Sequence, residues 1–379
     1  MHRSILLTFL VLLFVTGAGA KGKRRKGKLP DVVERADGDL THLHLAEDPK
    51  KQGWLYKPPS REDDEQAQPA ADRRFDLIVA LHGAGGNPKN YFHRRMMEER
   101  QAWCLTVAGR QAVTTQHGEG FQWSGADRAY IADLVRYLVG KYPIDPERVI
   151  VWGHSAGGTM TLETLAHAPE LFAGGLTTAS PGTPSSTHTE KRVCVFLGTE
   201  DRNWSAAPTV RAHLERVQKK RGKGGACAFF AVDGLGHNVP EENYLALGFD
   251  WILQPKARGG EARVPQTAKG RSGTLHHILV RHKGAEGADG IKRSKSKAQK
   301  LLKKIRKEVA KSRAWFPFEA AAHSEDGASG SCGGGVEPDT LERAGVQVPE
   351  LKPGEVAGPL PGKEGFHLVY RPPAPTGAQ

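Results

Sequence analysis

Residues 148–158 read Arg-Val-Ile-Val-Trp-Gly-His-Ser-Ala-Gly-Gly, and this stretch decides the fold. An apolar, β-branched run stops at a G-x-S-x-G pattern, and a helical pattern follows it, so the stretch predicts a strand, a sharp turn and a helix. The turn needs glycine on both sides because side chains there would clash. It lifts the hydroxyl of Ser155 above a sheet and places the N–H of Ala156 at a helix N-terminus, aimed at a developing oxyanion.

Strand-like and helix-like segments alternate along residues 50–255. Short apolar runs alternate with helical patterns, which indicates a parallel sheet covered by helices on both faces, and so an α/β fold. The expected strands are Phe75–Leu81, Cys104–Ala108, Val149–Trp152, Leu176–Ala179, Val193–Leu197 and Ala226–Val232, and the expected helices are Ala126–Lys141, Ala156–Ala168 and Ala206–Lys220.

Two loops can supply the partners that a nucleophilic serine needs. Gly198-Thr-Glu-Asp201 and Asp233-Gly-Leu-Gly-His237 each follow an expected strand, and the carboxyl ends of parallel strands are where such a sheet carries its site. In the order serine, acid, histidine, we expect Asp201 to be the acid and His237 the base. Glu200 stays open as the alternative acid.

A glycine-rich loop, His82-Gly-Ala-Gly-Gly86, follows the first expected strand. Such a loop can turn a backbone N–H toward the same oxyanion, and we expect that of Ala84 to do so. His82 is interpreted as a residue that orients the loop. His154, within the serine turn, is a poor candidate for the base because its side chain should point away from Ser155.

The net charge of +12 is unevenly placed. Counting Lys and Arg against Asp and Glu gives +6 for residues 21–28, +13 for 256–319 and −4 for 320–379, which leaves about −4 for 29–255. Two basic regions therefore flank a mildly acidic body, and no DNA-reading motif or interleaved aromatic pattern accompanies them, which argues against a nucleic-acid partner. The lysines of the expected helix 295–313 are interpreted as its solvated face.

The N-terminus has the pattern of a secretory signal peptide. Met-His-Arg precedes an apolar run from Ile5 to Val15, and Ala18-x-Ala20 ends it. We expect export to the periplasm or beyond after removal of residues 1–20; an uncleaved anchor is the alternative. Residues 21–49 form a basic tail and lead-in, whose first eight residues either contact an anionic surface or remain solvated. The four cysteines lack a C-x-x-C spacing, and Cys194 and Cys227 lie in apolar runs, which favours buried thiols.

The C-terminal third reads as a linker and a small domain. Residues 256–271 are rich in Gly, Pro, Lys and Arg without periodicity, which is typical of a linker. Residues 272–373 follow the order strand, helix, helix, strand and predict a small α+β unit, and 374–379 form a tail.

The motifs between residues 53 and 254 together resemble the α/β-hydrolase fold, and more narrowly the polyhydroxybutyrate-depolymerase and feruloyl-esterase group of secreted esterases. The resemblance implies a cofactor-independent serine hydrolase with Ser155, Asp201 and His237 as the triad and with Ala84 and Ala156 as oxyanion donors. No long insertion forms a lid, which favours a bulky or polymeric ester, although the same parts hydrolyse amides. Trp123 and Trp204 are expected either to stack on the substrate at the mouth of the site or to pack in the core.

The second domain resembles the parvulin-type peptidyl-prolyl isomerases. The segments that carry this resemblance are Leu275-His-His-Ile-Leu-Val-Arg-His282, Arg293-Ser-Lys-Ser-Lys-Ala298, Ala321-Ala-His-Ser-Glu-Asp-Gly327, Leu351-Lys-Pro-Gly-Glu-Val-Ala-Gly-Pro359 and Gly365-Phe-His367. The resemblance implies an enzyme without metal or cofactor that acts on proline-containing polypeptides. Its paired histidines would be His277 and His367, and Asp326 would occupy the Cys/Asp position of the family.

The chain departs from that family at Cys332-Gly-Gly-Gly-Val336, where Gly-Gly-Asp-Leu-Gly is usual. A non-catalytic binding module or intramolecular chaperone is therefore the alternative for this domain, and Leu341 and Val346 are the candidates for gripping the proline ring. Cations on the loop near the site would favour acidic or phosphate-bearing residues before proline, and a solvated loop without this role is the alternative. These cations are Arg281, Lys283, Lys292 and Arg293.

Overall fold

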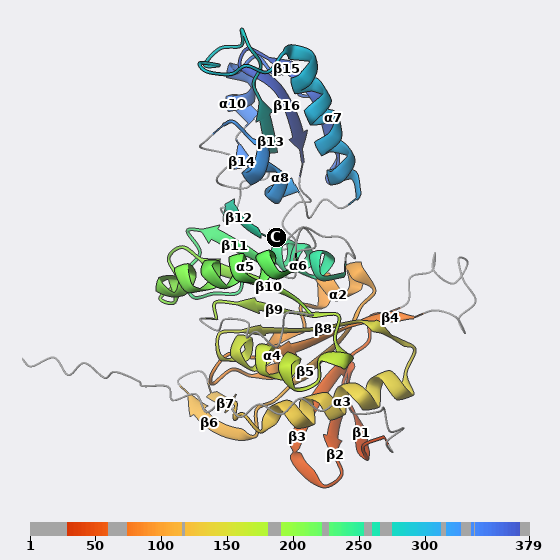
Figure 1. Cartoon of the computed structure of the whole chain (residues 1–379). Helices are drawn as coiled ribbons and strands as arrows, with labels where there is room; N and C mark the ends of the chain where they lie inside the picture. Colours follow the sequence, from red (N-terminus) through yellow and green to blue (C-terminus); the bar gives the residue numbers. More distant parts are fainter. Residues whose placement is uncertain are drawn as a thin grey trace, which may run out of the picture.

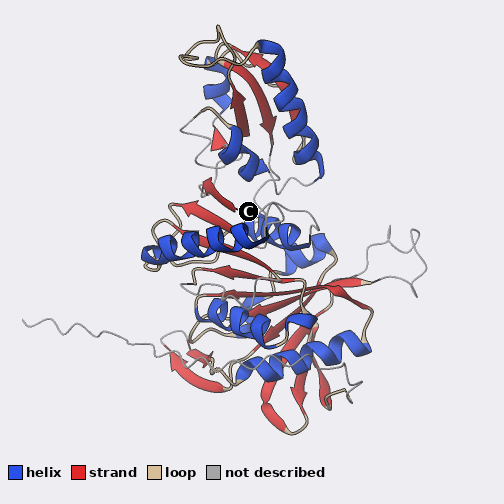
Figure 2. Cartoon of the chain, in the orientation of Figure 1, coloured by secondary structure: helices blue, strands red, loops and turns tan. Residues whose placement is uncertain are grey.

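The computed structural model describes residues 29–59, 74–115, 118–180, 191–221, 227–253, 260–265, 275–311, 316–326, 335–336 and 338–371. The predicted leader and its basic continuation to residue 28 lie outside this part of the chain. The described residues form two bodies, one built on a large mixed sheet and one on a small antiparallel sheet (Figures 1 and 2). Within them, no helix is long and apolar enough to cross a membrane.

The first body is built on a ten-stranded sheet with the order β1-β2-β3-β5-β4-β8-β9-β10-β11-β12. The contacts β1–β2, β2–β3 and β3–β5 are antiparallel, and all the others are parallel. The strands are β1 (Val32–Asp37), β2 (Leu40–Leu45), β3 (Asp48–Tyr56), β4 (Phe75–Leu81), β5 (Trp103–Val107), β8 (Ile144–His154), β9 (Gly174–Thr178), β10 (Arg192–Gly198), β11 (Cys227–Asp233) and β12 (Gly260–Pro265).

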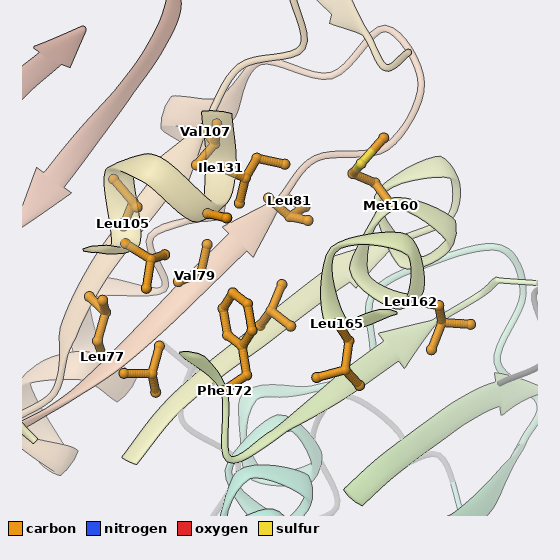
Figure 3. Close-up of a cluster of buried hydrophobic side chains, with 14 of the residues drawn as sticks. Leu77, Val79, Leu81, Leu105, Val107, Ile131, Met160, Leu162, Leu165 and Phe172 are labelled. Atoms are coloured by element: carbon orange, nitrogen blue, oxygen red, sulfur yellow. The ribbon is translucent and has the colours of Figure 1, made fainter. Parts of the chain in front are cut away.

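Helices cover both faces of this sheet, which confirms the predicted α/β class. Alternate residues of β4 point to opposite faces: Leu77, Val79 and Leu81 join a core with α3, α4 and α5, whereas Ile78 and Ala80 join one with α2 and α6. Figure 3 shows the first of these cores around β4 and α4. The helices are α2 (Arg94–Arg100), α3 (Asp127–Lys141), α4 (Ala156–His167), α5 (Ala207–Arg221) and α6 (Glu242–Leu253), with short 3-10 turns η1 (Pro88–Tyr91), η2 (Pro169–Leu171) and η4 (Trp204–Ala206).

Two predicted boundaries of this domain are wrong. Residues 21–49 were expected to precede the domain, yet β1 and β2 extend its sheet from Val32 onward. Part of the expected linker 256–271 is β12, which pairs in parallel with β11 at the far edge. β1 and β12 are the two edge strands and contain polar or charged residues, so they lack the apolar runs by which the central strands were recognised.

A separate hairpin also escaped prediction. β6 (Gln111–Thr115) and β7 (Gly118–Gln122) pair only with each other as a sheet. The hairpin is attached to the glycine-rich loop after β4, because Gly85 N–H donates to the carbonyl of Phe121 and Phe121 N–H donates to that of Gly86.

The second body has the predicted α+β class. Its sheet has the order β14-β13-β16-β15 and is antiparallel throughout. Apolar side chains of α7 and α8 form one core on this sheet, and Leu341 of α10 belongs to a second core. The elements are β13 (Leu275–Val280), α7 (Lys295–Lys311), α8 (Phe316–His323), β14 (Gly335–Val336), α10 (Pro338–Arg343), β15 (Val356–Gly362) and β16 (Gly365–Tyr370).

Candidate active sites

Ser155 lies at the sharp turn between β8 and α4, as predicted. Its backbone has φ 53° and ψ −117°, a conformation that costs energy for a residue with a side chain. Close packing explains the glycines around it: a Cβ on Gly153 would lie 2.1 Å from the carbonyl oxygen of Gly157, and one on Gly157 would lie 2.2 Å from that of Leu81. The backbone therefore packs so closely around this strained turn that neither Gly153 nor Gly157 could carry a side chain.

The loops after β10 and β11 bring the predicted acid and base to this serine. His237 Nε2 lies 2.9 Å from Ser155 Oγ, and His237 Nδ1 lies 2.9 Å from Asp201 Oδ1. Because the carboxylate of Asp201 accepts the Nδ1–H, the Nε2 atom is left as an acceptor for the serine hydroxyl. Glu200, the alternative acid, is exposed, and the carboxylate that meets the histidine is that of Asp201.

Asp201 is held in place by its own loop. Its side chain is fully buried, and Asn203 N–H donates to Oδ1 at 2.8 Å. The Asn203 amide in turn donates to the carbonyl of Ala179 at 3.0 Å. The acid therefore has little freedom to turn away from His237.

Backbone hydrogen bonds of the glycine-rich loop single out one free donor. Gly83 N–H donates to the hydroxyl of Tyr91, Gly85 N–H to the carbonyl of Phe121, and Gly86 N–H to that of Gly83. Among the described residues, no acceptor lies opposite the N–H of Ala84 or of Ala156, at the first turn of α4. These are the two donors that the sequence predicts for an oxyanion.

His82 and Trp123 hold this loop in place through hydrogen bonds and ring stacking. The His82 ring is buried, its Nδ1–H donates to Gly83 O at 2.7 Å, and its Nε2 accepts the Gly109 N–H at 3.0 Å. Trp123 stacks on the ring with 4.4 Å between centroids and donates its Nε1–H to the His82 carbonyl at 2.7 Å. Burial lowers the pKa of His82 to about 4, so the ring stays neutral.

Both tryptophans predicted near the mouth of the site are partly buried and contact other side chains. Trp123 is committed to His82, as just described. Trp204, in η4, packs against the buried core, stacks with Phe229 at 6.4 Å and carries Arg211 over its ring. The packing alternative therefore fits both residues.

His154 lies closer to the base than the sequence suggested. Its Nδ1 is 3.2 Å from Thr178 Oγ1, so it does not bond to Ser155, but its ring centroid is 5.3 Å from that of His237. Burial, together with the neighbouring His237, lowers the pKa of His154 to about 4. A neutral imidazole thus packs beside His237, a contact between the end of β8 and the loop after β11 that local sequence does not reveal.

In the second body, His277 of β13 joins His367 of β16 and Asp326. His277 Nε2 lies 2.8 Å from Asp326 Oδ2, and the two Nδ1 atoms of the histidines are 3.2 Å apart. If the carboxylate accepts the Nε2–H of His277, then His277 Nδ1 accepts from His367, whose Nε2 is left as an unprotonated acceptor. Burial and His277 lower the pKa of His367 to about 4, in agreement with a neutral ring.

This group lies in a pocket of about 340 Å³ whose walls are mostly polar. His367 Nε2 is buried and has no partner among the described residues. Leu341 lines the pocket, whereas Val346 lies in the core next to it. The lining residues are His277, Arg281, Glu286, Asp326, Thr340, Leu341, Arg343, Ala344, Lys363, Glu364 and His367.

The predicted cations are only partly brought to this pocket. Arg281 lines it, and its guanidinium lies 3.5 Å from Glu364. Arg293 is instead paired with Glu325 at 2.9 Å, and Lys292 is exposed outside the lining. Arg343 and Lys363, which sequence reasoning missed, also line the pocket, and the Lys363 ammonium donates to the carbonyl of Arg343 at 3.3 Å.

Cys104, Cys194 and Cys227 are buried thiols that form no disulfide, and the fourth cysteine, Cys332, lies outside the described residues. In the described part of the chain, no group of three His, Cys, Asp or Glu side chains is arranged to hold a metal ion.

Two family models match the chain, one in each body. The prolyl oligopeptidase family matches residues 120–234, which include Ser155 and Asp201. The PPIC-type PPIase domain matches residues 277–372, which include both paired histidines. The chain thus joins an α/β-hydrolase region to a PPIC-type rotamase domain.

Curated relatives match part of the first body. An acetylxylan esterase of Coprinopsis cinerea is 27% identical over 165 residues, which cover 38% of this chain and 40% of that protein. Feruloyl esterase B of Neurospora crassa is 32% identical over 107 residues, covering 26% and 37%. The chain therefore spans about two fifths of the length of these relatives. A fluorophosphonate-binding serine hydrolase of Staphylococcus aureus matches in structure with 12% identity and a TM-score of 0.41, covering 57% of this chain and 100% of that one.

Proposed function

We propose that the chain is a two-domain enzyme, in which an esterase with a serine nucleophile is joined to a peptidyl-prolyl cis-trans isomerase. The observation that carries the first half is the line of hydrogen bonds from Ser155 through His237 to Asp201, with a free Ala84 N–H on the glycine-rich loop. Similarity to acetylxylan and feruloyl esterases favours esters over amides as substrates, and bulky or polymeric esters among them.

The proposed reaction has two halves. His237 Nε2 takes the proton of Ser155 Oγ as Oγ attacks the ester carbonyl carbon, and the negative charge that develops on the carbonyl oxygen is stabilised by the N–H groups of Ala84 and Ala156. The C–O bond then breaks, and the alcohol leaves with the proton from His237. In the second half, water gives its proton to His237 and attacks the acyl-enzyme, which releases the acid and restores Ser155.

The Ser155→Ala variant tests this half of the proposal. It should hydrolyse p-nitrophenyl esters at least about a thousandfold more slowly than the wild type, because the nucleophile is gone. Ser205→Ala, at an exposed serine of η4, is the matched control and should retain full activity. Unchanged turnover in Ser155→Ala would refute the triad.

For the second body, we propose that the prolyl amide is turned in the pocket above His277, His367 and Asp326. The bond has a barrier of ~18–20 kcal/mol unaided, and the buried histidine pair, held by Asp326, offers a site of fixed polarity in which a twisted amide is favoured. The mostly polar walls of the pocket give weight to the alternative, a module that binds polypeptides without turning them.

Exchange measurements on the full chain distinguish these alternatives. In a Ser155→Ala background, the protein should accelerate cis/trans exchange of a prolyl peptide. Asp326→Ala should lower the catalysed rate of cis/trans exchange about tenfold or more, because it removes the partner that fixes the His277 tautomer. Asp289→Ala, at an exposed acid of the same domain, is the control. If the Ser155→Ala protein does not accelerate cis/trans exchange, the domain is a binding module and the isomerase proposal is refuted.

We also propose that the chain is exported, on the strength of the leader pattern in residues 1–20. Expression in a secreting host, followed by N-terminal sequencing of the exported product, should give Lys21 as the first residue. A product that retains Met1 and stays in the cell would contradict export.

A further inference from the structure

The outer face of α7 is a strongly charged surface that the proposed function does not use. The helix contains eight Lys or Arg residues and one Glu. Its apolar residues Ala298, Leu302, Ile305 and Val309 are buried against the sheet. At 100° per residue, five exposed lysines fall on the opposite side within an arc of about 120°. These residues, here called the lysine stripe, are Lys297, Lys300, Lys303, Lys304 and Lys307.

The stripe is not neutralised by the rest of the described chain. No carboxylate in the described ranges forms an ion pair with any of its five lysines. The two cations at the flank of the helix are used differently: Arg306 donates to the carbonyl of Gly358 at 2.8 Å, and Lys295 lies over the ring of Phe366 at 5.9 Å. The flanking cations thus hold the helix on its domain, whereas the stripe presents five charges outward over about 15 Å of helix.

The chemistry of the stripe favours an extended anionic surface. Lysine acts as a point charge, whereas recognition of single phosphates and of nucleic acids usually relies on the planar fork of arginine. The exposed face of α7 carries no aromatic residue on which a base could stack. It carries no exposed large apolar side chain either, so contact would be electrostatic, without insertion into the hydrocarbon.

We propose that the lysine stripe binds the surface of a bilayer that contains anionic lipids. Clusters of four to eight Lys or Arg on an amphipathic helix attract such surfaces, at about 1 kcal/mol for each cation near the headgroups. The stripe would hold the protein at the surface of such a membrane.

Vesicle sedimentation tests the proposal with the full chain. The protein should sediment with vesicles of phosphatidylcholine containing about one third phosphatidylglycerol at about 0.1 M salt. It should not do so with pure phosphatidylcholine, and about 0.5 M salt should release it. Replacing four stripe lysines by Glu should lower the partition coefficient about a hundredfold or more, and replacing the same four by Arg should preserve it. The four are Lys300, Lys303, Lys304 and Lys307.

A control variant with the same net charge separates the stripe from general electrostatics. It carries Glu at four exposed cations elsewhere, Arg35, Lys50, Arg216 and Lys352, and should keep most of the binding. Equal loss in both variants would overturn the proposal, as would sedimentation with neutral vesicles. So would binding to heparin or duplex DNA, but not to anionic vesicles, at the same salt. Both variants should hydrolyse p-nitrophenyl esters normally, which shows that they are folded.

Discussion

Substitution of Gly120 by alanine should displace the glycine-rich loop that carries Ala84, while leaving Ser155, Asp201 and His237 unchanged. Gly120 lies in β7, and a Cβ there would be 2.0 Å from the carbonyl oxygen of Gly85 and 2.5 Å from its carbonyl carbon. Both atoms are backbone, so the clash cannot be relieved by turning a side chain. A Cβ essentially never lies closer than 3.0 Å to another heavy atom. To lengthen the 2.0 Å contact with the Gly85 oxygen to 3.0 Å, the hairpin and the glycine-rich loop must separate by about 1 Å.

That separation should appear in kcat. Gly85 adjoins Ala84, whose N–H is the proposed donor, and the loss of one oxyanion donor costs about 10²–10³ in kcat, while a 1 Å displacement alone can cost about a hundredfold. We expect kcat for a p-nitrophenyl ester to fall about a hundredfold with a smaller change in KM, because the donor acts in the transition state.

The matched control is Gly125→Ala. A Cβ at Gly125 would meet only the ends of the Arg128 and Glu163 side chains, at 3.4 and 3.6 Å, so activity should be retained. Circular dichroism and a thermal melt of both variants establish that they are folded. A folded Gly120→Ala protein with kcat within about threefold of the wild type would refute the assignment of Ala84 as a donor.

The remaining predictions concern the acid and the buried histidines. Asp201→Asn should lower kcat about 10⁴-fold because the His237 tautomer is lost, whereas Glu200→Gln should leave kcat within about twofold; the reverse pattern would exchange their roles. Burial lowers the pKa of His82, His154 and His367 to about 4, so below their unfolded pKa of about 6.5 the unfolded chain binds more protons than the folded one. Stability should therefore fall as pH is lowered from about 6.5 toward 4, and a urea midpoint that is the same at about pH 5 and pH 7.5 would contradict this.

The three side chains proposed as the triad could be predicted because each lies in a short local pattern. Ser155 follows an apolar strand and precedes glycines, and Asp201 and His237 each end a loop just after a strand. Because parallel strands end at one edge of the sheet, three local patterns sufficed to place three side chains together. The same logic brought Ala84, in the loop after β4, into the prediction.

What escaped prediction depends on contacts between distant residues. β1 and β12 are polar edge strands. They can be recognised as strands only from their pairing with β2 and β11, since their composition does not indicate it. The ion pair between Arg293 and Glu325 joins residues far apart in the chain, so the sequence could not show that Arg293 is unavailable to the pocket. Likewise, the hairpin β6–β7 matters because it bonds to Gly85 and Gly86, and nothing in its own residues indicates that partner.

The central claim, that Ser155 forms an acyl-enzyme, can be tested by trapping that intermediate. Brief mixing of the protein with a p-nitrophenyl ester, acid quenching and intact mass spectrometry should reveal one added acyl group, which peptide mapping should place on Ser155. The Ser155→Ala protein should carry none, while Asp201→Asn should acquire it far more slowly. An acyl group on another residue, or rapid hydrolysis by the wild type and Ser155→Ala alike, would contradict the account.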